Sequence, residues 1–126
     1  MLRTFARCGP ELTSLTSPEG VEGQTCVMTD GRATGAHSYY RNTTGDELRS
    51  VLTLMGPGGR TVEARCAVES QDEPGGCETP HRSSCGGPDE YVAVAEYAGG
   101  GVPDGTAEEA PLLLRSGSDP APSAAG

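Results

Sequence analysis

Hydrophobic and polar residues alternate along several short segments in the middle of the chain, which is the pattern of half-buried β-strands. The cleanest alternation runs through Arg60–Val68, with apolar residues on one face and mostly polar residues on the other. Turn-forming residues bound these segments, including Asp30–Gly31 and Gly56–Gly59. Five strands and a possible sixth are predicted: Gln24–Thr29, Thr34–Arg41, Leu48–Met55, Arg60–Val68, Tyr91–Tyr97 and, as the possible sixth, Pro111–Ser116.

The number and spacing of these strands predict an all-β fold. We expect a small antiparallel β-sandwich, immunoglobulin-like or related, of five to six strands with disulfide-stapled loops. A small Greek-key barrel is the alternative. The hydrophobic pattern predicts no helix of normal length.

Composition divides the chain into segments of different character. Within the core, Glu69–Pro88 has no periodicity and is predicted to be one long loop. The predicted division is an extended N-terminal segment at 1–23, the sandwich core at 24–98, a flexible Gly-rich and acidic loop at 99–110, a possible edge strand at 111–116 and a disordered tail at 117–126.

The overall composition limits the core and the range of partners. The chain has 126 residues, of which 34% are hydrophobic and 4% aromatic, so a single domain with a modest core is expected. Its net charge of −9 argues against binding to nucleic acid or to anionic membrane surfaces. The longest apolar runs, Val92–Ala95 and Leu112–Leu114, fall far short of the roughly 20 residues that span a bilayer. All nine basic residues are arginine and isoleucine is absent, which indicates a GC-rich genome such as an actinobacterial one.

The five cysteines change this picture, because a domain with a thin core usually needs covalent cross-links. We favour pairing the near neighbours Cys8 with Cys26 and Cys66 with Cys77, which leaves Cys85 free. In the chain-entropy model, closing loops of that size contributes roughly 3 kcal/mol per disulfide. The odd count leaves other pairings open, but these two are the ones that we favour.

A zinc site is the competing interpretation of the same residues. Cys66, Cys77, His81 and Cys85 together offer three sulfurs and one imidazole, which is a chemically adequate ligand set for zinc. Structural zinc sites typically place two cysteines within a few residues of each other, however, and these spacings are wider.

Disulfides also indicate an oxidising compartment, so an extracytoplasmic location is expected, either secreted or at the cell surface. The first ten residues contain no apolar stretch of the kind found in signal peptides. We therefore expect the export signal to be missing from this chain. The alternative is a cytoplasmic protein whose cysteines are reduced.

Two histidines are the main candidates for chemistry. His37 shares one predicted strand face with Tyr39 and Arg41, and these three residues form a candidate contact surface. His81 is close in sequence to Cys85, but no motif for an oxyanion hole accompanies the pair. No catalytic residue and no cofactor are assigned, and the protein is not expected to be an enzyme.

Several short segments resemble those of small extracytoplasmic proteins of actinobacteria, which are secreted or membrane-anchored and of unknown function. The segments are Cys8–Gly9–Pro10, Cys26–Val27, Tyr39–Tyr40–Arg41–Asn42 and Cys66–Ala67–Val68. This resemblance covers roughly residues 8–116 and implies no reaction. The spacing of Cys66 and Cys77 is similar to that of a disulfide-closed loop in the subtilisin inhibitors of the same bacteria. The Cys-Pro reactive segment of those inhibitors is absent here, so no site residue is transferred.

The expected function is that of a non-enzymatic, extracytoplasmic β-sandwich module with an unknown protein partner, in an interaction or accessory role. One alternative is an inhibitor of an exported protease that presents the Glu69–Pro80 loop. A second alternative is an intracellular zinc-binding domain.

Overall fold

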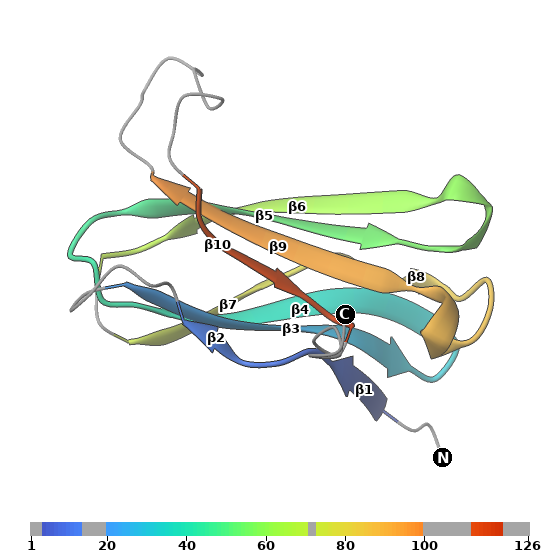
Figure 1. Cartoon of the computed structure of the whole chain (residues 1–126). Coiled ribbons are helices and arrows are strands. Elements are labelled where there is room, and N and C mark those ends of the chain that lie inside the picture. Colours follow the sequence, from blue (N-terminus) through green and yellow to red (C-terminus); the bar gives the residue numbers. More distant parts are fainter. Residues whose placement is uncertain (1–3, 14–19, 71–72, 100–111, 120–126) are drawn as a thin grey trace, which may run out of the picture.

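The computed structural model describes residues 4–13, 20–70, 73–99 and 112–119 as two antiparallel β-sheets packed face to face (Figure 1). These residues contain no α-helix, only the short 3₁₀ turns η1 (Pro57–Gly59) and η2 (Pro88–Glu90). The predicted all-β sandwich is confirmed. The described strands are β1 (Thr4–Cys8), β2 (Leu12–Thr13), β3 (Val21–Asp30), β4 (Ala33–Asn42), β5 (Leu48–Met55), β6 (Thr61–Val68), β7 (Pro74–Glu78), β8 (Arg82–Ser83), β9 (Val92–Gly99) and β10 (Leu112–Gly117).

The order of the strands within each sheet follows an immunoglobulin-like pattern. Sheet A runs β1-β3-β4-β7, with β2 added to β3 and β8 added to β4, and sheet B runs β10-β9-β5-β6. With β3, β4 and β7 as strands A, B and E, sheet B reads G-F-C-C′. The chain crosses between the sheets at β4–β5, β6–β7 and β8–β9, so each sheet contains strands that are distant in sequence (Figure 1).

Two hairpins follow the predicted turn signals. Gly31 joins β3 to β4 with a φ of 64°, and Gly58 and Gly59 join β5 to β6 with φ of 73° and 74°. These are left-handed conformations that residues with a Cβ adopt only at a cost. The hairpins therefore set the registers of the β3–β4 pair and of the β5–β6 pair. Every residue of β5 pairs with one of β6.

The core lies between the sheets and is built from alternate residues of the facing strands. It is composed of small and medium side chains, and Tyr97 is its largest fully buried member. The core cluster consists of Val21, Val27, Ala36, Leu48, Leu52, Leu54, Val68, Cys77, Tyr91, Ala93, Ala95, Tyr97 and Leu114. Because so many of these side chains are small, the core depends on close packing and has little room for bulky residues.

A set of buried hydroxyls crosses the middle of this core. The Tyr97 hydroxyl of sheet B contacts Ser38 Oγ of sheet A, and Ser50 faces the same hydroxyl. Thr25 Oγ1 donates to Ser38 Oγ at 3.3 Å and lies 2.9 Å from Ser116 Oγ. Burial raises the pKa of Tyr97 above its usual value of 10.0, although the hydrogen bond with Ser38 partly offsets this rise.

The structure adds four strands to the six that were predicted. β1 and β2 lie within residues 1–23 and both pair with β3, so this extended segment is part of sheet A. β7 and β8 lie within Glu69–Pro88, which was predicted to be a loop, and both pair with β4. Proline and glycine conceal β7 in the sequence, because its first three residues carry no large side chains and show no hydrophobic alternation. β2 and β8 are two residues each, which is too short for any alternation to be seen.

Thr79 maintains the hydrogen bonding to β4 between the end of β7 and the start of β8. Pro80 has no backbone N–H to donate, and the strand is interrupted there. Thr79 donates its N–H to the carbonyl of Ala36, and its Oγ1 accepts the N–H of Ala36 at 2.9 Å. The buried backbone of β4 therefore remains paired across the interruption.

Tyr91 fixes the corner before β9. Its ring is buried, and its hydroxyl accepts the backbone N–H of Cys85 at 2.7 Å. A tyrosine at the start of strand F that bonds to backbone a few residues upstream is a known feature of immunoglobulin-like sandwiches. It holds the β8–β9 connection against the end of the core.

The end of the described chain is packed against sheet B. β10 pairs with β9 at the sheet edge, where the possible strand at 111–116 was predicted. Ser118, in the segment predicted to be a disordered tail, is buried, and its Oγ accepts the N–H of Ala93. Most of the predicted loop at 99–110 and the last residues of the tail, 120–126, lie outside the described residues. Within the described part of the chain, no helix is long and apolar enough to cross a membrane.

Candidate functional site

Two disulfides cross-link the sandwich at different places. Cys8–Cys26 joins the paired strands β1 and β3 of sheet A, and Cys66–Cys77 joins β6 of sheet B to β7 of sheet A. Cys85 is free and partly buried. These are the pairings that the sequence analysis favoured, and two disulfides are more typical of extracellular proteins.

The disulfide between the sheets bears directly on the proposed zinc ligands. Cys66 and Cys77 are bonded to each other, so in this state neither supplies a thiolate to a metal. Across the described ranges, no three histidine, cysteine or acidic side chains are grouped closely enough to hold a metal ion.

Part of the segment considered as an inhibitory loop is a strand of sheet A. Pro74–Glu78 is β7, which pairs with β4 along its length.

The predicted contact surface lies on the outer face of sheet A. His37, Tyr39 and Arg41 follow one another on that face of β4, and we call them the β4 strip. The rings of His37 and Tyr39 are stacked, with centroids 4.1 Å apart and planes 8° apart. Tyr39 remains 44% exposed. The structure therefore joins two of the three predicted residues into one rigid unit.

Glycines on neighbouring positions make room for these rings. A Cβ on Gly76 of β7 would lie 2.6 Å from Nε2 of His37, so the imidazole lies over bare backbone. On β4 itself, a Cβ on Gly35 would lie 2.2 Å from Cδ2 of His81. His81 therefore extends the β4 strip by one more ring at its start, a relation that the sequence analysis missed. Aromatic rings that cover strand glycines are a recognised device of β-sheets.

Charged residues flank the β4 strip on both sides. Nδ1 of His37 lies 3.5 Å from a carboxylate oxygen of Glu78, the residue opposite it on β7. Glu22 on β3 is opposite Arg41. Both carboxylates are exposed, so their interactions are weak in water, and they give the face a mixed charge that suits polar partners.

A shallow hollow of about 290 Å³ adjoins the β4 strip. It lies over the β2–β3–β4 part of sheet A, so aromatic, cationic and anionic groups all border it. Its lining residues are Glu11, Leu12, Thr13, Glu22, Gly23, Gln24, Tyr39, Tyr40 and Arg41. Together with the β4 strip it offers a continuous polar and aromatic surface.

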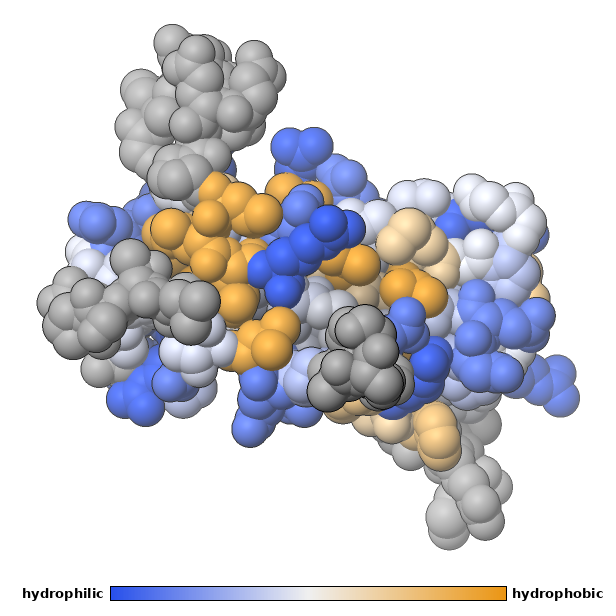
Figure 2. Space-filling view, viewed as in Figure 1, coloured by the Kyte–Doolittle hydropathy of each residue, from blue (hydrophilic) through white to orange (hydrophobic). Residues whose placement is uncertain are grey.

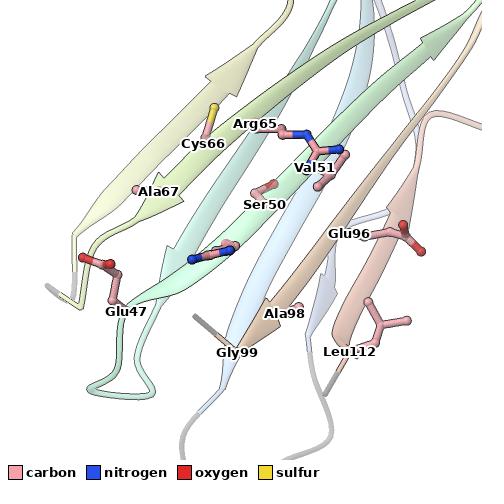
Figure 3. Close-up of a pocket in the computed structure, with 11 residues that line it drawn as sticks. Glu47, Ser50, Val51, Arg65, Cys66, Ala67, Glu96, Ala98, Gly99 and Leu112 are labelled. Carbon is pink, nitrogen blue, oxygen red and sulfur yellow. The ribbon is translucent and has the colours of Figure 1, made fainter. Parts of the chain in front are cut away.

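A second hollow, of about 620 Å³, lies on sheet B (Figure 3). Arg49 of β5 lies between Ala67 of β6 and Ala98 of β9, and these small neighbours leave the space. Hydrophobic residues gather nearby over the facing ends of β9 and β10, where Leu112 is 55% exposed (Figure 2). No sequence signal marked this hollow, because it depends on which residues are neighbours across three strands.

No protein-family model, curated protein or solved structure matches this chain. The function must therefore be inferred from the residues themselves. The outer face of sheet A combines exposed stacked rings, a guanidinium and a hollow, which suits binding.

Proposed function

We propose that this protein is a non-enzymatic, extracytoplasmic binding module that contacts a protein partner through the outer face of sheet A. The observation that carries the proposal is the exposed His37–Tyr39 stack, held over Gly76 beside the adjoining hollow. Exposed aromatic residues are costly to leave in water and are enriched at the centres of protein interfaces.

The β4 strip is also rigid, which favours binding. Its backbone is paired on both sides, with β3 and with β7, and the rings restrict each other by stacking. A surface that is already ordered loses little conformational entropy when a partner binds. Tyrosine and arginine are moreover the residue types that most often dominate the binding energy of an interface.

The binding role is tested by removing the rings without disturbing the sheet. We expect the double variant His37→Ser, Tyr39→Ser to lose about 30-fold or more in affinity for any exported or cell-surface protein that the wild type retains, since anchors of this kind contribute about 2 kcal/mol or more. The measurement is surface plasmon resonance of fractionated cell-surface proteins on the immobilised oxidised chain. The matched control is Thr53→Ser on the outer face of sheet B. Equal retention by all three proteins would contradict the proposed surface.

The extracytoplasmic location is tested by counting free thiols in the producing cells. We expect a thiol-alkylating reagent added before lysis to label one cysteine per chain, Cys85, because the other four are paired. Intact mass without reduction gives the number of labels. Five labels on the protein from its native compartment would contradict an oxidising location, and the variant Cys85→Ser, with no label, is the control.

A further inference from the structure

The edges of the two sheets differ in how they are protected. An edge strand presents unpaired backbone N–H and C=O groups, and monomeric proteins usually blunt it with prolines, bulges or short strands. In the described residues, sheet A ends at β1–β2 and at β7–β8, while sheet B ends at β10 and at β6.

Three of these edges are interrupted. Pro10 separates β1 from β2, and Pro80 separates β7 from β8. Pro74 also opens β7, and β10 has a register shift between Leu112 and Leu114. None of these strands offers a partner more than a few regular residues in a row.

The edge strand β6 has none of these interruptions. It runs from Thr61 to Val68 without proline or glycine, and all eight residues pair with β5 without a bulge. The Cys66–Cys77 disulfide fastens it to the opposite sheet, so its edge is held in place. An edge that is uninterrupted over eight residues and held in place is a ready template for a further strand.

Charge selects a second copy of this chain as that strand. Glu63 and Arg65 are both exposed on the outer face of β6, and they form an ion pair at 2.9 Å within the strand. If two β6 strands pair antiparallel about a two-fold axis at Ala64, Glu63 of each copy faces Arg65 of the other. Registers centred on Glu63 or on Arg65 would instead place like charges opposite each other, which is unfavourable.

We propose that two copies of this protein associate through their β6 edges, antiparallel and centred on Ala64, to form one continuous eight-stranded sheet. In this register each residue lies opposite a residue from the same face of the sheet. Thr61 of one copy is opposite Ala67 of the other, and Val62 is opposite Cys66. The hollow of sheet B, which Arg65 and Ala67 border at β6, then adjoins the hollow of the second copy across the axis (Figure 3). The contact is isologous and closed, so it ends at a dimer.

The test is a charge exchange on the full, oxidised chain, followed by sedimentation velocity over a range of concentrations. The wild type is expected to be a dimer, and Arg65→Glu is expected to raise the dissociation constant by about tenfold, because both symmetry-related pairs become repulsive. Glu63→Arg is expected to act in the same way. The double variant Glu63→Arg, Arg65→Glu is expected to restore the wild-type constant. Both side chains are exposed, so the variants fold, which circular dichroism verifies.

Arg115→Glu on β10 is the matched control, because it reverses one exposed charge on the same sheet and changes the net charge by the same amount. It is expected to leave dimerisation unchanged. A wild type that is monomeric up to about 1 mM would overturn the proposal. The partner of the β6 edge would then be a strand from another protein. Equal dimerisation of wild type and Arg65→Glu, a double variant that remains weak, or an equally weakened Arg115→Glu would also overturn it.

Discussion

Replacing Cys66 and Cys77 together by alanine is expected to lower the free energy of unfolding by about 3 kcal/mol. The disulfide closes a loop between residues 11 apart in sequence, and its loss releases that restriction in the unfolded chain. It also joins the two sheets at an edge where no backbone hydrogen bond can do so, since β6 and β7 belong to different sheets. For a domain with a total stability of about 5 to 15 kcal/mol, the loss is large.

Urea unfolding followed by circular dichroism measures this effect as a lower free energy of unfolding in water, obtained from the midpoint and the slope together, because the released unfolded chain exposes more surface. Cys85→Ser is the control and is expected to stay within about 0.5 kcal/mol of the wild type, because this thiol is not in a disulfide. The prediction is wrong if the double alanine variant loses less than about 1 kcal/mol, well under the usual cost of removing a disulfide.

Replacing Tyr97 by alanine is expected to destabilise the protein by about 4 kcal/mol, which is typical when a fully buried aromatic ring is removed. The ring lies at the centre of the sandwich, where it meets the edge of the Tyr40 ring at a centroid distance of 5.8 Å. Its hydroxyl also bonds to the buried Ser38 Oγ of the opposite sheet. Alanine therefore leaves both a cavity and a buried serine hydroxyl that has lost a partner.

Tyr97→Phe separates the two contributions, because it keeps the ring and removes the hydroxyl. We expect it to cost about 2 kcal/mol, within the range for leaving buried polar groups without their partner. Tyr39→Phe on the outer surface is the matched control, with an expected effect below about 0.5 kcal/mol. If Tyr97→Phe is as mild as this control, the hydroxyl cluster does not hold the sheets together.

The pH dependence of stability gives a second readout of the same substitution. The raised pKa of Tyr97 means that, above pH 10.0, the unfolded chain loses the phenol proton while the folded chain keeps it. The free energy of unfolding is therefore fully maintained below pH 10.0 and falls as the pH rises toward the pKa of the folded state. Tyr97→Phe should flatten this decline in part, because burial and Glu69 also raise the pKa of Tyr40.

The strands with large alternating side chains could be predicted from sequence, and β5 begins and ends at the predicted residues. Alternation reports burial on one face of a sheet, and that is a local property of the strand. β7 could not be found in this way, because Pro74, Gly75 and Gly76 carry no such pattern. Hydrogen bonds to β4 and the disulfide at Cys77 hold it in the sheet instead.

The candidate site likewise contains residues that could be placed from the sequence and residues that could not. His37, Tyr39 and Arg41 could be placed on one face from their spacing, since residues two apart on a strand point the same way. The glycine beneath the His37 ring and the position of His81 depend on which strands lie side by side. Those neighbours are set by the cross-strand register, which no local pattern encodes.

By itself, the sequence determined the class of fold, the residues of the β4 strip and the favoured cysteine pairs, because each of these depends on periodicity or on proximity along the chain. Only the tertiary structure decided that β6 is the one uninterrupted edge among the described strands and that Arg49 lies between two alanines in a hollow. The physical reason is that edges and hollows arise from contacts between strands distant in sequence, and the order of those strands is settled when the two sheets bury their apolar faces against each other.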